Sequence, residues 1–466
     1  MTSPPDKSIK RIKTGFFERR LELAKAGFIS GSKILSHSAA NFWASPEEKA
    51  RRNKELMAEQ AQYMADEIGK LKGSVVKIGQ MMALYGEYFL PREITDALHT
   101  LEDDTAALDW SAIHTQLDNE LGSAKLAKLE IDEYPLACAS LGQVHRARRR
   151  KDGKELCIKV QYPGVADSID SDFNAVIQLL TFSHLVTSKR AFEHWLREAR
   201  AMLHQEADYH QEAHNTQFAA QMLAGDERYI VPEVFPEFSS ARVLTLSYEP
   251  GLVITDQRVD ALPLRRRNQI ATAALDLFLT ELFDWGEIQT DPNFGNYRIR
   301  LGDAKQPDRL VLLDFGAMKK FPPNFLEPFR HMIAAAHLDQ REAFLENAIA
   351  LEFMRADYPQ EVLQNFADVA MEIIEPLAAH YHQVPEFALN AKGEYRWAAS
   401  NLPKRVAKKA SQASLSKYFA LPPKEFMFMN RKLMGVYSFI KTLRAEFNGG
   451  DILSPYIKRA GSTAAH

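Results

Sequence analysis

Cysteine is scarce in this chain, long apolar runs are missing, and neither sign of charge dominates. Two cysteines among 466 residues cannot form a disulfide framework, and this usage is typical of a reducing compartment. Lys and Arg number 58 against 61 Asp and Glu, so the net charge of −3 gives no drive toward nucleic acid. No stretch reaches the roughly 18 consecutive apolar residues that a membrane-spanning helix requires. With 46% hydrophobic residues, the chain is expected to be globular.

The N-terminal segment is basic. MTSPPDKSIK has no apolar core of the kind that a secretory signal contains. Residues 7–33 then carry eight Lys or Arg against two acidic residues, and apolar residues recur among them at roughly helical spacing. We expect residues 1–40 to hold a basic amphipathic helix. It either binds an anionic membrane surface or packs on its own domain, and its three glycines favour packing. The expected location is cytoplasmic, with peripheral association at an inner membrane as the alternative and no transmembrane helix.

Residues 41–130 are expected to form a helical extension. Ser45 can cap a helix that begins at Pro46, and Glu48 completes the capping-box pattern. A further helix is predicted through GSVVKIGQMMALYGEYFL, which Pro91 ends.

From Pro135 the pattern becomes strand-like. Residues 143–149 and 155–161 flank an Asp-Gly pair, which predicts a hairpin. Helical spacing returns at residues 165–223, and strand-like runs follow at 229–234 and 242–248. We expect residues 131–248 to form a mixed lobe with inserted helices, residues 249–450 a largely helical lobe, and residues 451–466 a frayed tail.

Three motifs resemble parts of a phosphotransfer site. The first is LCIKV, in which Lys159 lies within an apolar strand. A lysine in a core strand is costly unless it is paired, and a kinase pairs it with nucleotide phosphates and a helix carboxylate.

The second motif is QTDPNFGN, in which Asp291 and Asn296 are spaced as in a D-x-x-x-x-N catalytic loop. Asp291 is predicted to accept the proton of an attacking hydroxyl or to orient a water. The third is LLDFG, which puts Asp314 directly after a predicted buried strand. Asn296 and Asp314 are predicted to bind Mg²⁺ that bridges the nucleotide phosphates.

Each motif alone has a simpler interpretation. An Asp-Pro-Asn run is usually a turn, and a lysine in a short strand usually extends to solvent. Their order and the elements that carry them favour a kinase-like nucleotide site, which is a more specific signal than any single motif.

The chain also departs from ordinary protein kinases. The loop before the lysine strand is ACASLGQ rather than glycine-rich, and Gln289-Thr290 replaces the usual His-Arg before the catalytic aspartate. After Asp314, Phe321-Pro322-Pro323 leads quickly into a helix, so the peptide-docking activation segment is expected to be missing.

With these departures the chain resembles the UbiB/ADCK family of atypical kinases, which are tied to ubiquinone biosynthesis. The family motifs K-x-G-Q, alanine-rich loop, E-x-D, T-D-P-N and D-F-G appear in order here, at Lys77–Gln80, Ala137–Ser140, Glu206–Asp208, Thr290–Asn293 and Asp314–Gly316. The resemblance covers roughly residues 70–330. It implies an α+β, bilobal protein-kinase-like fold with an N-terminal helical extension that carries K-x-G-Q and a largely helical C-terminal lobe.

The resemblance also implies roles for individual residues. A polar cluster where a peptide would otherwise bind would contain Lys77, Gly79, Gln80, Glu206 and Asp208. Nucleotide contacts are expected from Ala137, Cys138, Ala139, Ser140, Lys159, Glu212 and the hinge residues Ser247, Tyr248 and Glu249. Glu212 is our candidate partner for Lys159, but the sequence alone leaves Glu206 open. Without the resemblance, Lys77 would be interpreted as a solvated helix lysine and Cys138 as a small buried residue.

The expected function is that of an ATP-binding, Mg²⁺-dependent atypical kinase or ATPase that supports quinone biosynthesis. Its partners would be ATP or ADP, and an anionic membrane surface with quinone-pathway lipids or enzymes, but no nucleic acid. The alternatives are a nucleotide-gated scaffold, a true protein kinase and an antibiotic-type small-molecule kinase. His380 and His382 are interpreted as surface residues because no cysteine or suitably spaced carboxylate accompanies them.

Overall fold

The computed structural model describes residues 73–86, 89–98, 107–182, 186, 188–303, 305–380, 384–412 and 424–463, with single residues and runs of two or three between 45 and 66. The predicted basic helix in residues 1–40 lies outside this part of the chain. The predicted cap at Ser45 is confirmed, because the amide of Glu48 donates to Ser45 Oγ at 3.2 Å. The described chain separates into two compact units, and each is formed by two segments. The first unit contains the described residues up to 217 together with 233–248, and the second contains 218–232 together with the described residues from 249 onward.

The first unit contains a four-stranded antiparallel sheet in the order β1-β2-β3-β5. Its strands are β1 (Leu129–Cys138), β2 (Gly142–Arg149), β3 (Glu155–Gln161) and β5 (Val243–Ser247). Strand β1 begins earlier than the predicted change at Pro135. In β3, Leu156, Ile158 and Val160 alternate into a core, so Lys159 projects from the opposite face.

The hairpin between β2 and β3 is confirmed. Gly153 has a φ of 72°, which an Asp-Gly turn supplies without strain. Asp152 Oδ1 accepts the amide of Lys154 at 3.2 Å, so the aspartate stabilises its own turn.

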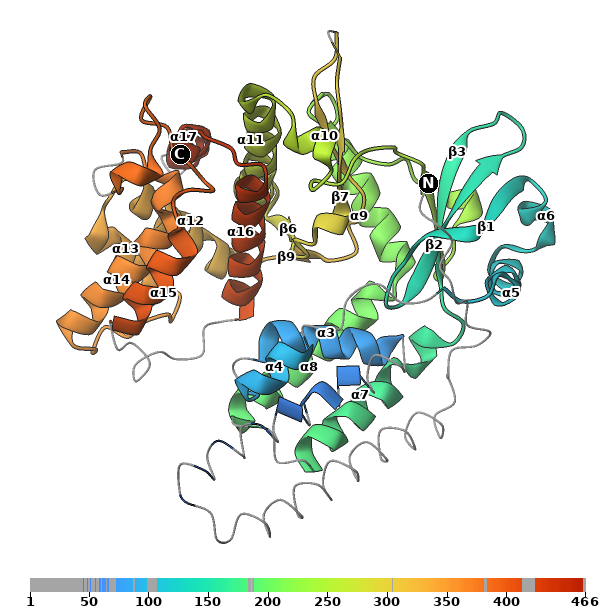
Figure 1. Cartoon of the computed structure of the whole chain (residues 1–466), viewed down its shortest axis with the longest axis horizontal. Coiled ribbons are helices and arrows are strands. Elements are labelled where there is room, and N and C mark those ends of the chain that lie inside the picture. Colours follow the sequence, from blue (N-terminus) through green and yellow to red (C-terminus); the bar gives the residue numbers. More distant parts are fainter. Residues whose placement is uncertain are drawn as a thin grey trace. The chain divides into compact units, whose positions relative to one another are not determined.

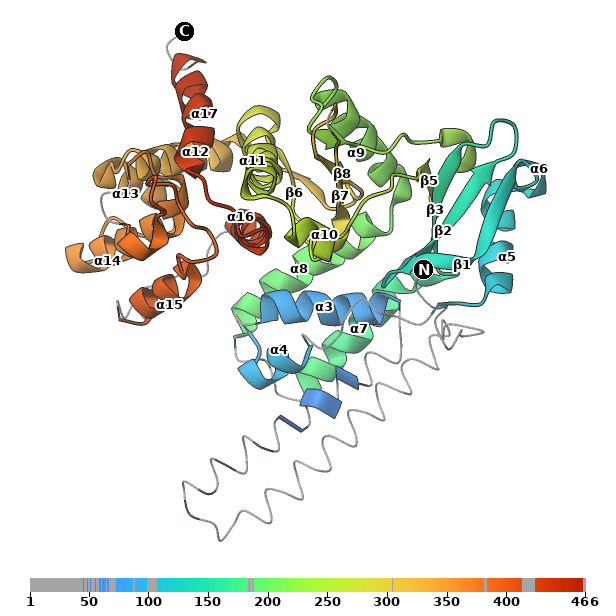
Figure 2. The same ribbon diagram turned by 45° about the horizontal axis from the view of Figure 1, so that its top comes forward.

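Some helices of the first unit pack on this sheet, and others pack on one another. Figures 1 and 2 show α3 beside α7 and α8, and these three helices pack on one another. The helices of the first unit are α3 (Ser74–Tyr85), α4 (Arg92–Leu98), α5 (Trp110–Leu121), α6 (Ser123–Leu126), α7 (Val165–Phe182), α8 (Lys189–Glu206) and most of α9 (Tyr209–Met222), with a 3₁₀ turn η2 (Pro236–Phe238). Leucines and Ile113 of α5 enter the same core as β3. The K-x-G-Q helix α3 is fixed to α7 because the buried Asp172 carboxylate accepts the hydroxyls of Ser74 and Ser168.

The second unit is mostly helical around two small sheets. These sheets are β4-β8-β7 and β6-β9, formed by β4 (Tyr229–Ile230), β6 (Glu287–Gln289), β7 (Tyr297–Arg300), β8 (Arg309–Leu312) and β9 (Met318–Lys320). The helices are α10 (Gln257–Asp260), α11 (Leu264–Thr280), α12 (Pro323–His337), α13 (Arg341–Ala350), α14 (Gln360–Ile374), α15 (Leu402–Gln412), α16 (Lys424–Thr442) and α17 (Gly449–Thr463). Shorter turns are the π-helical η3 (Glu281–Trp285) and the 3₁₀ turns η4 (Phe294–Asn296), η5 (Glu375–Leu377) and η6 (Glu386–Ala388). Helices α11 and α16 lie side by side in both views.

Two expected boundaries need correction. Residues 218–232 belong to the second unit, because β4 pairs in parallel with β8. The predicted frayed tail is helical as far as Thr463, because Leu453 and Tyr456 of α17 are buried and the helix packs on α11. Burial of these side chains outweighs the low helix propensity of the two glycines at its start.

Candidate functional site

The first unit pairs Lys159 with Glu212. Lys159 Nζ lies 2.7 and 2.8 Å from the two carboxylate oxygens of Glu212 on α9, and 5.0 Å from the centre of the Tyr209 ring. The Glu212 side chain is 3% exposed, whereas that of Lys159 is 20% exposed. The carboxylate therefore compensates the charge of the strand lysine, and the ammonium still reaches solvent.

The other acid, Glu206, pairs with the lysine of the K-x-G-Q motif. Lys77 Nζ on α3 lies 2.6 Å from Glu206 Oε1 at the end of α8. Asp208 instead accepts the amides of His210 and Gln211 at 3.0 and 3.2 Å, so it caps α9. The structure thus brings Lys77 and Glu206 together and gives Asp208 a backbone partner.

The other two residues of the K-x-G-Q motif also lie on α3. Gly79 is buried in this helix, and Gln80 is half-buried one residue later.

The alanine-rich loop was expected to precede the strand that carries Lys159, which is β3. In the structure it lies one strand earlier and connects β1 to β2. Ala137 and Cys138 belong to β1, and the amide of Ala139 donates to the Gly142 carbonyl at 2.8 Å. Gly142 is required, because a Cβ there would lie 2.3 Å from the carbonyl oxygen of Val160. Ser140 is buried. The turn is therefore tight, and its backbone at Gly142 packs directly on β3, the strand that carries Lys159.

The predicted hinge follows β5. The amide of Ser247 donates to the Glu233 carbonyl at 2.8 Å, and that of Tyr248 donates to the Glu155 carbonyl at 3.1 Å. An adenine base beside these two residues would therefore use their carbonyl oxygens rather than their amides. Glu249, the first residue of the second unit after the hinge, pairs with Arg300 at 2.7 Å.

The catalytic-loop motif lies between β6 and β7. Asn293 Oδ1 accepts the amide of Gly295 at 2.7 Å, which fixes the turn η4. Asn296 Nδ2 donates to Asp291 Oδ2 at 3.0 Å, and Arg431 Nη2 on α16 lies 2.9 Å from Asp291 Oδ1. Both oxygens of the Asp291 carboxylate are therefore held, one by each neighbour.

Gln289 and Thr290 join this loop to the Asp-Phe-Gly segment. The side chain of Gln289 accepts the Asp291 amide at 2.6 Å and donates to the Asp314 carbonyl at 2.8 Å. Thr290 donates to the Ala317 carbonyl through its amide at 3.0 Å and its hydroxyl at 2.8 Å. These two buried residues, which replace the usual His-Arg, hold the two motifs in one constellation.

The Asp-Phe-Gly segment follows β8, one residue beyond its end. The amide of Leu313 donates to the Asn296 carbonyl at 2.9 Å, and the amide of Gly316 donates to Asp314 Oδ1 at 2.8 Å. Phe315 is buried.

Asn296 and Asp314 suit a hard divalent cation such as Mg²⁺. Because Asn296 donates to Asp291 through Nδ2, its Oδ1 projects from the other side of the amide, as a metal ligand requires. No group of three or more His, Cys, Asp or Glu is placed to hold a metal anywhere in the described ranges, this loop included, and His382 lies outside them.

The sequence interpretation missed the contribution of α16. Two residues of this helix reach the catalytic loop, because Arg431 contacts Asp291 and Gly435 lies against Pro292. The available signal was the pair Arg431-Lys432 within the largely apolar run FMFMNRKLMGVYSFI, because buried charges require partners.

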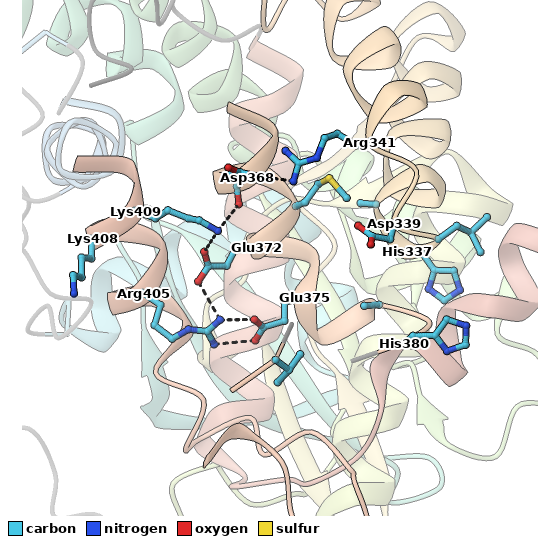
Figure 3. Close-up of a pocket in the computed structure, with 15 residues that line it drawn as sticks. His337, Asp339, Arg341, Asp368, Glu372, Glu375, His380, Arg405, Lys408 and Lys409 are labelled. Atoms are coloured by element: carbon cyan, nitrogen blue, oxygen red, sulfur yellow. Dashed lines mark hydrogen bonds and ion pairs between the residues drawn. The ribbon is translucent and has the colours of Figure 1, made fainter. Parts of the chain in front are cut away.

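A pocket of about 450 Å³ lies apart from these motifs among α12, α14 and α15 (Figure 3). A chain of polar contacts runs along its wall through Arg341, Asp368, Lys409, Glu372, Arg405 and Glu375. All its links are ion pairs except the one from Asp368 to Lys409, in which the ammonium donates to the main-chain carbonyl of Asp368 at 3.2 Å. Four basic residues line the pocket together with four acidic residues, so it favours neither an anionic nor a cationic ligand. The charges fasten α14 to α15.

No helix in the described part of the chain is long and apolar enough to cross a membrane.

Comparison with known proteins relates this chain to kinase-like proteins. Residues 100–348 match the family model described as the ABC1 atypical kinase-like domain. The Caenorhabditis elegans protein named "Atypical kinase coq-8, mitochondrial" is 29% identical over 408 residues, covering 87% of this chain and 52% of that protein. The Dictyostelium discoideum protein named "Probable serine/threonine-protein kinase abkA" is 30% identical over 404 residues, covering 83% and 69%. The chain therefore spans about half the length of the first of these relatives.

Among the solved structures that are similar to this chain, one is covered over nearly its whole length. It is Rv3197 of Mycobacterium tuberculosis, solved as a complex with erythromycin, with a TM-score of 0.57 and 21% identity. The similarity covers 88% of this chain and 98% of that one. At this level of identity the similarity concerns the fold alone.

Proposed function

The chain belongs to the ABC1 atypical kinase-like domain family, and from this premise we propose that it is a Mg²⁺-dependent, ATP-binding enzyme that supports ubiquinone biosynthesis. It hydrolyses ATP or phosphorylates a small or lipid-linked acceptor. The family and the α+β protein-kinase-like fold expected from the sequence are both confirmed. The observation that carries the proposed activity is the hydrogen-bonded constellation of Asp291, Asn296 and Asp314.

Each residue of this constellation has a role in the proposal. Asn296 and Asp314 would hold Mg²⁺, which neutralises charge on the nucleotide phosphates when it is bound. Asp291 orients the nucleophile and takes up the proton that it loses. In hydrolysis the water oxygen bonds to the γ-phosphorus while the bond to the β,γ-bridging oxygen breaks, and the products are ADP and phosphate. Lys159, held by Glu212, binds the α- and β-phosphates.

A small acceptor is favoured over a protein because only a short stretch of chain separates the Asp-Phe-Gly segment from the next helix, α12. Strand β9 ends at Lys320 and α12 begins at Pro323, so no long segment is available there to dock a peptide. The family resemblance supplies the proposed link to quinone lipids.

Release of phosphate from Mg-ATP tests the proposal. The wild type is compared with Asp314→Asn, and the control is Asp357→Asn, which removes an exposed carboxylate paired with Arg355. Each protein is assayed with and without anionic liposomes and a phenolic mimic of a quinone precursor. We expect turnover that rises with lipid and phenol and falls by at least about 100-fold in Asp314→Asn, because the metal loses its carboxylate. The control should match the wild type.

Three outcomes would overturn parts of the proposal. Nucleotide that raises the melting temperature of the wild type without any turnover would favour the nucleotide-gated scaffold. ATP turnover that does not change when liposomes and the phenolic mimic are added would support an ATPase activity but contradict the proposed lipid-linked role. Phosphorylation of a peptide library would instead support a true protein kinase.

A further inference from the structure

Helix α16 brings a cation to the catalytic loop from a distant part of the chain. Arg431 is 140 residues beyond Asp291 in sequence, and its Nη2 lies 2.9 Å from Asp291 Oδ1. The two side chains are 24% and 29% exposed, so the pair lies where a ligand of the loop can reach it. None of the motifs that define the site in the sequence includes Arg431.

The two contacts of the Asp291 carboxylate are complementary. Asn296 donates to Oδ2 from within the loop, and Arg431 donates to Oδ1 from outside it. With a partner on each oxygen, rotation of the carboxylate would break a charge-assisted hydrogen bond on one side or the other. The position of the carboxylate therefore depends on α16 as well as on the loop.

Helix α16 is anchored at the level of Arg431 by three further contacts. The next residue, Lys432, lies 3.0 Å from Glu281 of η3, and both side chains are 1% exposed. One turn later Gly435 touches the loop so closely that a Cβ would lie 2.0 Å from Cβ of Pro292. On the other side, the Lys319 ammonium of β9 lies 3.7 Å from the centre of the Phe428 ring. The backbone that carries Arg431 is thus fixed to both the catalytic loop and the strand after the Asp-Phe-Gly segment.

We propose that Arg431 is a positioning residue of the phosphotransfer reaction, which holds the Asp291 carboxylate in the orientation that directs the nucleophile. The proposal rests on the proposed function, because it assigns Arg431 to the same reaction. The anchors favour a permanent positioning role over a gate, since a gate requires movement that the buried ion pair and the Gly435 contact oppose. The Arg431 charge also offsets that of Asp291, which eases approach of the anionic phosphates.

Steady-state kinetics with Mg-ATP test the proposal, with four proteins compared: the wild type, Arg431→Met, Arg431→Lys and Lys441→Met. Lys441 is an exposed lysine on the same helix and serves as the matched control. We expect Arg431→Met to lower kcat by about 100-fold, the loss typical of a misplaced catalytic group, with KM for Mg-ATP within about threefold. Arg431→Lys should lose about tenfold, because an ammonium holds one oxygen less firmly than a guanidinium. The control should match the wild type.

Two further readouts separate positioning from a merely structural role. Guanidinium ion at non-denaturing concentration should partly restore kcat in Arg431→Ala, which a folding defect would not permit. Mg-ADP with aluminium fluoride, which mimics the transferred phosphoryl group, should bind the wild type more tightly than Mg-ADP alone. Arg431→Met should lose this difference while it keeps its affinity for Mg-ADP.

The outcomes distinguish this inference from the proposed function. Wild-type turnover that persists within twofold in Arg431→Met overturns the inference alone. A fall in kcat that is matched by lost Mg-ADP binding, with no rescue by guanidinium, also overturns it in favour of a structural role. A wild type that neither turns over ATP nor binds Mg-ADP more tightly with aluminium fluoride overturns both.

Discussion

Two of the lysine–glutamate ion pairs in this molecule, Lys159–Glu212 in the first unit and Lys432–Glu281 in the second, differ in their access to solvent. Lys159 and Glu212 are 2.7 Å apart and Lys432 and Glu281 are 3.0 Å apart, so the contacts themselves are alike. The Lys159 side chain is 20% exposed, whereas both side chains of the second pair are 1% exposed. A ligand can therefore reach Lys159, and Lys432 is restricted to a structural role beneath the catalytic loop.

Burial has opposite effects on the two members of the second pair. It acts to lower the pKa of Lys432, but the Glu281 carboxylate and Tyr297 outweigh it, so the pKa is raised. For Glu281, burial raises the pKa, and the Lys432 ammonium opposes the shift only in part. Each charge is thus tolerated because of the other, which is typical of an ion pair removed from water.

Loss of one member of the buried pair should give the largest effect. We expect Lys432→Met to lower the free energy of unfolding by about 3–5 kcal/mol, because Glu281 is left buried without its cation. The double variant Lys432→Met with Glu281→Leu should recover most of this loss. Urea unfolding of the wild type, both single variants and the double variant measures the coupling. A double variant no more stable than the worse single variant would contradict the interpretation.

Loss of the partly exposed Lys159 should act mainly on activity. We expect Lys159→Met to lower ATP turnover by at least about 100-fold, which corresponds to about 2.7 kcal/mol of transition-state stabilisation, because phosphate contacts are lost. Its free energy of unfolding should also fall, because the nearly buried Glu212 loses its cation, but by less than in Lys432→Met, since the site of the lysine is partly open to solvent. Lys154→Met, which removes an exposed lysine paired with Glu233 in the same sheet, is the control. The comparison of the two pairs fails if Lys159→Met unfolds the chain as readily as Lys432→Met.

A buried histidine of the first unit should give a smaller, pH-dependent effect. His145 is fully buried, with Nδ1 2.7 Å from the Asp132 carbonyl and Nε2 2.8 Å from Gln143 Nε2. The carbonyl accepts and the amide nitrogen donates, so the ring is neutral. Burial lowers the pKa of His145, although the Asp132 carbonyl and charge oppose this shift. Its environment thus stabilises the neutral state, whereas the two lysines are stabilised as cations.

The sign of the pH effect follows from this lowered pKa. Below about pH 6.5 the unfolded chain takes up a proton that the folded His145 resists, so stability falls as the pH falls, by at most about 1.4 kcal/mol per pH unit. His145→Gln should flatten the dependence of the melting temperature between pH 7 and pH 5.5. His337→Gln provides a parallel in the second unit, because burial lowers the pKa of that histidine too. An unchanged slope in His145→Gln would show that other groups control acid sensitivity.

The sequence by itself determined the features that depend on local order. The alternation of Leu156, Ile158 and Val160 predicts β3 and the face from which Lys159 projects. The Asp-Gly pair predicts the hairpin turn, because few residues tolerate positive φ. Five motifs in order predicted the family and the fold class, and both predictions are confirmed.

Only the tertiary structure decided which distant residues meet. Glu206 and Glu212 are both acidic residues of helical segments, and the packing of α3 and α9 assigns the first to Lys77 and the second to Lys159. Helix α16 likewise supplies Arg431 to Asp291 through contacts that no local pattern encodes. The same reason explains α17, whose Gly-Gly start predicts fraying until burial of Leu453 and Tyr456 is known. Propensity and periodicity act within about one helical turn, whereas ion-pair choice depends on how separate elements pack.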